Sequence, residues 1–294
     1  MLHAAAAQAA GFDVAGRVPA SLSRLSIEEL GEIEISSVSR RPERVADAPA
    51  AVYVITRDDI RRSGATTLPE ILRLAPNLQV ARVNANSYAI SARGFNNSSA
   101  NKLLVMIDGR SVYTPLHSGV FWDVQEVMVE DIERIEVVSG PGGTLWGANA
   151  VNGVINVVTR SAKDSTGTLL AATAGNRRRG VAARQGAPLG RETSVRAYVR
   201  DFRFDHSVTA DGSAVPDGWS RRQAGFRADG GPDAVAWTLQ GDVYDGRAEA
   251  SSGTDRRTSG GNLLLRFGRD IDAHSGVQVQ AYLDRTRRDE PGLF

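Results

Sequence analysis

Residues able to carry out chemistry are few in this chain of 294 residues, and their spacing forms no catalytic constellation. Cysteine is absent, which excludes a disulfide framework and a thiolate metal site. The histidines are scattered, so the sequence predicts no bound metal. The formal net charge is +1, which gives no support for a nucleic-acid partner. The four histidines are His3, His117, His206 and His274.

A glycine-rich run from Gly140 to Gly153 invites comparison with a phosphate-binding loop, but its spacing does not fit one. Gly140 and Gly142 have no third glycine at the fingerprint position, where Leu145 stands. No Lys followed by Ser or Thr comes after Gly147, so a P-loop is excluded too. No Ser–His–Asp set is marked by a nucleophile elbow. The sequence therefore predicts no catalytic residue, no enzyme and no cofactor.

The elements around this run predict a compact α/β unit. Thr56 with Asp59, and Thr67 with Glu70, resemble helix caps, and Gly64 is expected to end the first helix. Asp108–Gly109 is a strong hairpin turn. Alternating or β-branched runs predict strands at 33–39, 51–55, 78–83, 88–92, 103–107, 110–113, 135–138 and 154–159.

After Lys163 the pattern changes to long alternating strands separated by polar, glycine-rich turns. One face of each strand is apolar and the other polar, as a lipid-facing barrel with a wet lumen requires. The alternative is a soluble β-sandwich, in which the apolar faces pack on each other. Strands of about 12 residues favour the barrel, because globular strands average about 5–6. The expected strands are 168–175, 180–187, 193–204, 221–229, 234–245, 262–269 and 276–287.

The N-terminal region predicts a flexible lead over residues 1–30. Met1–Ala10 is rich in alanine and is interpreted as a possible remnant of a signal peptide, although it lacks a basic start. The alternative is a cytoplasmic protein with an alanine-rich tail. No apolar run approaches the ~18 residues that a membrane helix needs.

Four blocks in the α/β part resemble the plug domain of TonB-dependent outer-membrane transporters. The resemblance implies a mainly β protein, with an α/β plug domain at 31–164. About seven antiparallel strands of an incomplete transmembrane β-barrel follow at 165–294. Because such barrels have 22 strands, the chain is interpreted as a fragment. The blocks are Ala48–Thr56 with Asp59–Ile60, Ser91–Asn96 (Ser–Ala–Arg–Gly–Phe–Asn), Leu103–Tyr113, and Glu133–Arg160.

The function implied by this resemblance is energy-coupled import of a scarce ligand across the outer membrane of a Gram-negative bacterium. The expected ligand is a ferric siderophore or cobalamin. The other expected partners are TonB, the inner-membrane energy-coupling complex, and outer-membrane lipid. An alternative function is a standalone periplasmic ligand-binding or signalling protein that uses the plug fold. The sequence does not identify the ligand.

Site residues carried over from the family, or expected from loop position, form three groups. Arg93 and Arg134 match arginines that lock plug to barrel by pairing with barrel glutamates; the alternative is two solvated strand-end residues. Ile33, Glu34, Ile35, Ser36, Ser37 and Val38 form the candidate TonB box, which could instead be a plug strand without TonB contact. Loop residues could contact ligand or simply pack, and these are Asn84, Asn86, Phe95, Asn96, Tyr113, His117, Phe121 and Trp122.

Overall fold

The chain divides into two compact units in the computed structural model. The mixed unit comprises the described residues of 12–83 and 87–160, and the strand unit comprises those of 1–11, 84–86 and 161–294. No helix among the described residues is long and apolar enough to cross a membrane. The described residues are 3–4, 34–35, 37, 43–48, 50–94, 96–99, 102–141, 146–147, 149–232, 234–250, 254–272 and 275–290.

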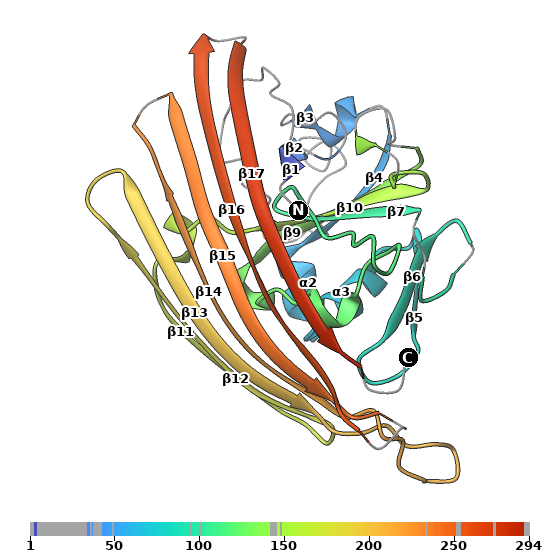
Figure 1. The fold of residues 1–294 in the computed structure, drawn as a ribbon. Helices are drawn as coiled ribbons and strands as arrows, with labels where there is room; N and C mark the ends of the chain where they lie inside the picture. Colours follow the sequence, from blue (N-terminus) through green and yellow to red (C-terminus); the bar gives the residue numbers. More distant parts are fainter. Residues whose placement is uncertain are drawn as a thin grey trace. The chain divides into compact units, whose positions relative to one another are not determined.

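A five-stranded sheet forms the centre of the mixed unit, in the order β4-β9-β10-β7-β8 (Figure 1). Among the described strands, β7 and β10 alone pair in parallel, and β2–β3 and β5–β6 form two separate two-stranded sheets. The bounds are β2 Glu34–Ile35, β3 Glu43–Arg44, β4 Ala51–Thr56, β5 Leu78–Arg82, β6 Tyr88–Ala92, β7 Leu103–Ile107, β8 Arg110–Ser111, β9 Ile132–Ser139 and β10 Gly153–Thr159.

Both faces of this sheet are covered by apolar side chains, because successive residues of a strand point to opposite sides. On one face, Ile135 and Ile155 pack with Ile60 and Leu68 of the short helices α2 (Arg57–Ser63) and α3 (Leu68–Ile71). The other face holds a second, smaller cluster. The residues of that cluster are Ile35, Val54, Leu104, Met106, Val138, Ala150 and Val154.

The first predicted capping box is confirmed; at the second, the helix starts after Thr67 as predicted, but the capping box does not form. Thr56 and Asp59 form a reciprocal capping box, and Gly64 ends α2 with a left-handed φ of 67°. Thr67 begins α3 with no capping hydrogen bond from its side chain. The Glu70 carboxylate accepts from Arg73 Nε at 2.7 Å and from Tyr88 Oη at 2.8 Å instead. Glu70 therefore binds Arg73 and Tyr88 in place of the backbone amide of Thr67.

Short 3₁₀ turns connect the longer elements of the mixed unit, and the predicted hairpin turn is present. Asp108 and Gly109 both have positive φ, 50° and 77°, as a tight turn between β7 and β8 requires. The 3₁₀ turns are η2 Val45–Asp47, η3 Leu72–Leu74, η4 Trp122–Val124 and η5 Val129–Asp131.

The strand unit is an antiparallel sheet in which β11 to β17 pair in chain order, so the predicted mainly β fold with seven such strands is confirmed. The two-residue strand β1 (His3–Ala4) pairs with β17. The 3₁₀ turn η6 (Lys163–Ser165) precedes β11. The bounds are β11 Gly167–Ala174, β12 Arg178–Pro188, β13 Thr193–Phe204, β14 Trp219–Gly230, β15 Val235–Ala248, β16 Arg256–Asp272 and β17 Ser275–Asp289.

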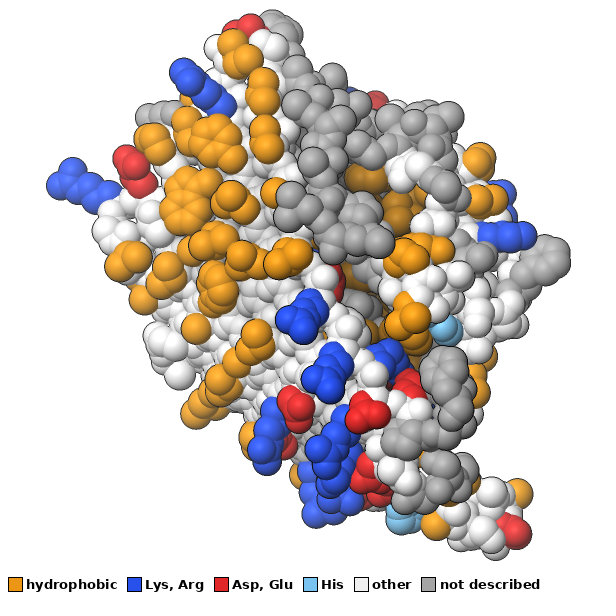
Figure 2. Space-filling model, in the orientation of Figure 1, with side chains coloured by type: hydrophobic (Ala, Val, Ile, Leu, Met, Phe, Trp, Pro, Cys, Tyr) orange, Lys and Arg blue, Asp and Glu red, His pale blue; other side chains and the backbone are white. Residues whose placement is uncertain are grey.

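The two faces of this sheet differ in chemistry, as the alternation predicted. Exposed apolar side chains gather on one face, which Figure 2 shows as a broad orange area bordered at one end by charged side chains. The register places Arg203, Arg247 and Arg257 in one row across the strands at that charged end. The exposed apolar residues include Leu170, Val181, Val199, Phe226, Val243, Leu263, Leu265, Phe267, Val279 and Leu283.

Candidate ligand-binding site and coupling segment

A basic and aromatic cluster lies on the polar face of the strand unit, where β13 ends and β14 begins. The Phe204 ring stacks on Trp219 with centroids 5.1 Å apart, and Phe202 meets Trp219 edge to face at 5.0 Å. The Arg200 guanidinium lies 5.0 Å from the centroid of Phe202, and that of Arg221 lies 4.3 Å from the centroid of Tyr244. Cations over aromatic faces are attracted by the ring quadrupole.

Buried arginines extend this cluster along the polar face of the sheet. Arg200 donates to Gln223 Oε1 at 3.2 Å, and Arg227 pairs with half-buried Asp229 at 2.7 Å. A guanidinium stays charged at any physiological pH, so these side chains place positive charge on this face, together with carboxylates such as Asp229 and Asp242. These arginines were not among the predicted site residues, although their alternation with apolar residues indicated that they lie on the polar face. The buried arginines are Arg184, Arg196, Arg200, Arg221 and Arg227.

Residues 84–86, between β5 and β6, belong to the strand unit and not to the unit that surrounds them in sequence. The Ala85 amide donates to Asp217 Oδ2 at 2.8 Å, and Trp219 Nε1 donates to the Ala85 carbonyl at 2.9 Å. Asn86 is 3% exposed, and its Oδ1 accepts from Arg256 Nη2 at 3.4 Å. Asn84 is half-buried, and its Oδ1 accepts from the Asn86 amide. These contacts favour the packing interpretation of Asn84 and Asn86.

Two of the predicted ligand loops contact each other in the mixed unit. The His117 ring stacks on Phe121 at 4.3 Å, and His117 Nε2 lies 3.1 Å from the Ser98 carbonyl oxygen. Tyr113 is half-buried at the start of this loop. Phe95 lies outside the described residues, and its neighbour Asn96 is exposed.

Trp122 was expected among the ligand contacts and lies in the hydrophobic core. Its side chain is 7% exposed and belongs to the same cluster as Val120 and Ile132. It starts the 3₁₀ turn η4, which follows the His117 loop. Because an aromatic side chain in a loop can serve either a core or a ligand, sequence alone did not separate the two roles.

The two candidate lock arginines have different surroundings in the mixed unit. Arg134 Nε lies 2.7 Å from Glu136 Oε1, two residues away on β9, and Glu136 has no exposed surface. Arg93 is exposed and has a left-handed φ of 58°. Arg134 therefore has a carboxylate partner inside its own unit, and pairing with glutamates of the barrel stays a prediction for both arginines.

The candidate TonB box is only partly described, and its described residues are folded into the mixed unit. Ile33, Ser36 and Val38 lie outside the described residues. Glu34–Ile35 form β2, which pairs with β3, and both Ile35 and Ser37 are buried. A segment packed in this way has to detach before it can add as a strand to a partner, and the TonB-box assignment stays a prediction. The geometry favours the alternative that these residues are a strand of the plug.

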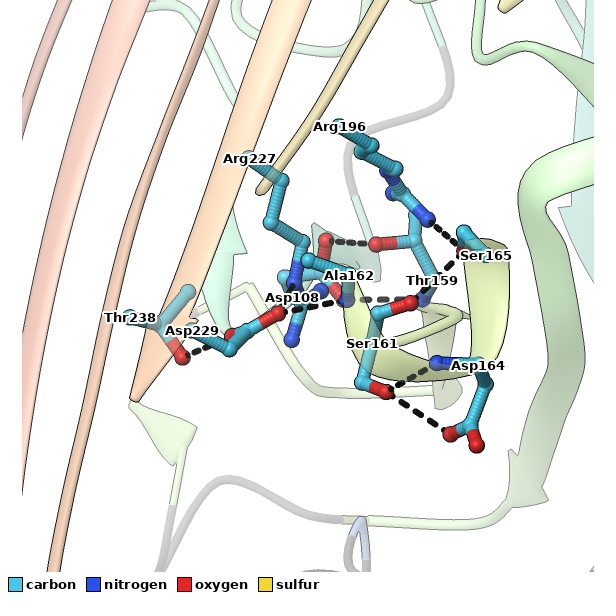
Figure 3. A network of polar contacts seen from close by, with 10 residues as sticks. All are labelled: Asp108, Thr159, Ser161, Ala162, Asp164, Ser165, Arg196, Arg227, Asp229 and Thr238. Atoms are coloured by element: carbon cyan, nitrogen blue, oxygen red, sulfur yellow. Dashed lines mark hydrogen bonds and ion pairs between the residues drawn. The ribbon is translucent and has the colours of Figure 1, made fainter. Parts of the chain in front are cut away.

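The segment that joins β10 to β11 is fixed by polar contacts in each unit (Figure 3). In the mixed unit, Asp108 accepts from the Thr159 amide at 2.8 Å and from its hydroxyl at 2.7 Å. In the strand unit, Asp229 Oδ2 accepts from the Ala162 amide at 2.7 Å, and Arg196 Nη1 donates to Ser165 Oγ at 2.8 Å. Both ends of the connection are therefore held by buried or half-buried charged groups.

Comparisons with known proteins agree on one family. Residues 44–154 match the model of the TonB-dependent receptor plug domain. The chain is 29% identical to the vitamin B12 transporter BtuB of Vibrio vulnificus over 160 residues, which are 54% of this chain and 25% of that protein. It is also 29% identical to BtuB of Vibrio cholerae over 145 residues, 49% of this chain and 23% of that protein.

Solved structures share the fold. The ferric-catecholate import receptor Fiu of E. coli K12 superposes with a TM-score of 0.66 at 19% identity, over 85% of this chain and 40% of Fiu. The pyoverdine receptor FpvA of Pseudomonas aeruginosa gives 0.68 at 13% identity, over 86% of this chain and 40% of FpvA. The chain thus spans about a quarter of the curated relatives and two-fifths of these structures.

Proposed function

We propose that this chain, whose residues 44–154 match the plug domain of the TonB-dependent receptors, serves energy-coupled import of a scarce ligand across a Gram-negative outer membrane. The observation that carries the proposal is a plug domain followed directly by seven long strands with one apolar and one polar face. A barrel built from such strands encloses a polar lumen that needs a plug. The standalone periplasmic protein has no use for the exposed apolar face.

The buried arginines favour an anionic ferric siderophore as the ligand. Arginine forms strong, charge-assisted hydrogen bonds with carboxylate or phenolate oxygens, and rings such as Tyr244 add apolar contact. Arg200 and Arg221 lie beside these rings on the polar face. Cobalamin is the second candidate, supported by the vitamin B12 transporters among the relatives.

Energy for import is proposed to come from TonB acting on the plug. The boundaries proposed for the working parts are the lead at 1–30, the plug domain at 31–164 and the barrel strands at 165–294. Arg93 and Arg134 remain our candidates for the lock between plug and barrel wall. The loop containing Tyr113, His117 and Phe121, together with Asn96, remains the candidate ligand surface of the plug.

Binding measurements on the chain in detergent micelles test the ligand. The panel contains a ferric catecholate, a ferric hydroxamate, ferric citrate and cyanocobalamin, and the readout is quenching of tryptophan fluorescence, because Trp219 lies in the basic cluster. We expect saturable binding of at least one anionic chelate and none of cyanocobalamin. Saturable binding of cyanocobalamin alone would favour the second candidate, and binding of neither would contradict the ligand assignment.

Neighbouring arginines on β14 provide a matched pair of variants. Arg221 lies on the polar face and is 2% exposed, whereas the Arg222 side chain is 85% exposed on the other face and pairs with Asp201. We expect Arg221→Gln to weaken binding of the chelate about tenfold, which is about 1.4 kcal/mol. Arg222→Gln should leave the affinity unchanged, and equal effects of the two substitutions would argue against the basic face as the ligand site.

A further inference from the structure

A buried carboxylate lies where the central sheet of the plug would otherwise be apolar. Register places Glu136 of β9 between Val54 of β4 and Asn156 of β10, and Met106 of β7 follows in the same row. This row belongs to the sheet face that carries the smaller apolar cluster. Glu136 has no exposed surface. A charge in such a place is stable only when several groups bind it.

One of those groups comes from the segment that precedes the sheet. The Ser37 amide donates to Glu136 Oε2 at 3.0 Å, beside Asn156 Nδ2 at 3.4 Å, while Arg134 holds the other oxygen. The Ser37 carbonyl accepts from Trp146 Nε1 at 2.7 Å. Both backbone groups of Ser37 are thus bound by side chains that lie 99 and 109 residues further along the chain.

We propose that Glu136 and Trp146 form a clip that fastens the segment at Ser37 to the plug, and that a pull applied to this segment opens the clip before it loads the central sheet. β1 is paired with β17 in the strand unit, and between β1 and β4 the described contacts of the chain are the two-residue pair β2–β3, the turn η2 and this clip. β4 is an edge strand, paired with β9 alone. Among the described contacts, a pull applied at Glu34 therefore meets the β2–β3 pair, the two hydrogen bonds of the clip and the burial of Ile35 before it loads the central sheet. Glu136 and Trp146 act by holding the backbone of Ser37, through which the force would reach the plug.

The inference depends on the proposed function only for the source of the pull, so the clip can be tested without TonB. The measurement is hydrogen–deuterium exchange of the full chain in detergent, followed in a peptide that covers residues 34–44. Glu136→Gln removes the charge, and Trp146→Phe removes the Nε1 donor. We expect each substitution to speed exchange at the Ser37 amide at least tenfold, because its two anchors act together.

Matched controls exist for both substitutions. Glu133 lies on the same strand and pairs with Arg160 at 3.7 Å, so Glu133→Gln should not affect the segment. Trp122 lies in the other apolar cluster, so Trp122→Phe should not affect it either. Exchange in β9 and β10 reports whether each variant is folded. If Glu136→Gln disrupts the fold, exchange at Ser37 in Trp146→Phe alone tests the clip. Exchange at Ser37 that matches the controls would overturn the clip.

Mechanical pulling on the same chain from a handle attached at Glu34 provides the second readout, because the N-terminal strand β1 is itself paired with β17. The clip predicts an early opening step at low force that shifts to still lower force in Glu136→Gln, with later steps unchanged. A variant can show faster exchange at Ser37 and still have an unchanged first step. This result would confirm the clip but contradict its role in force transfer. Failure of import with an intact clip would count against the proposed function alone.

Discussion

Single carboxylates fix the backbone at the places where this chain changes direction. Asp108 occupies a left-handed turn position and binds both the amide and the hydroxyl of Thr159 on the neighbouring strand. Asp229 binds the Ala162 amide in the same manner in the strand unit. An ionised acceptor that is shared by two donors is stronger than a neutral one. Removing it leaves buried donors without their acceptor.

Replacement of Asp108 should be among the most damaging single changes in the plug. Asp108→Ala removes two buried hydrogen bonds and places a Cβ-bearing residue without a polar side chain at positive φ, so we expect a loss of about 2–4 kcal/mol. Asp108→Asn tolerates the same backbone and keeps one acceptor, and its loss should be about half as large. Urea unfolding measures both, and equal stability of Asp108→Ala and the parent would contradict this role.

The burial of two loop residues could not be predicted from the sequence. Trp122 packs in the core and Asn86 is buried against the strands, although both lie in segments that read as exposed loops. Loop position predicted exposure, but Trp122 joins the apolar cluster of its own unit, and the segment of Asn86 binds Trp219 and Arg256, more than a hundred residues further along the chain. Nothing in the local pattern encodes such a partner.

Elements, in contrast, follow from local pattern to a large extent. The predicted strand at 193–204 matches β13 at both ends, and Thr56, Asp59 and Gly64 act as the caps expected of them. The first six residues of β16 were missed, because Arg256–Gly261 is polar on both faces and contains two glycines. This part of β16 lies at the charged end of the sheet, where neither face needs apolar side chains.

The two helix starts give a paired prediction at this scale. Thr56→Val keeps the size of the side chain but removes its capping hydrogen bond, so we expect a loss of about 1 kcal/mol. Thr67→Val removes no capping hydrogen bond and should cost less than half of that. Thermal unfolding followed by circular dichroism compares them. A larger loss for Thr67→Val would mean that its hydroxyl has a role beyond the helix start.

The whole molecule combines a plug whose sheet is covered on both faces with strands that leave one apolar face exposed. An apolar face of this extent is stable when hydrocarbon covers it. The charged row of Arg203, Arg247 and Arg257 then marks the end of the hydrocarbon band. We therefore expect the lipid bilayer to contact the rows between this charged end and Phe267.

Substitution with arginine along β16 tests where the band lies. Leu265 is 50% exposed in the apolar area, and Leu265→Arg should weaken insertion into lipid bilayers by about 2–4 kcal/mol. Ser259 lies beside Asp245 and Arg287 at the charged end, and Ser259→Arg should insert like the parent. Gel mobility before and after heating reports insertion. Equal insertion of both variants would contradict a lipid-facing surface.

The ion pair of Arg134 and Glu136 has a consequence for any displacement of the plug. The two residues are neighbours on one face of a single strand, so they travel together however far that strand moves. If the plug moves during the proposed import, the two side chains therefore move as an ion pair, and neither becomes a lone ion in a low-dielectric setting.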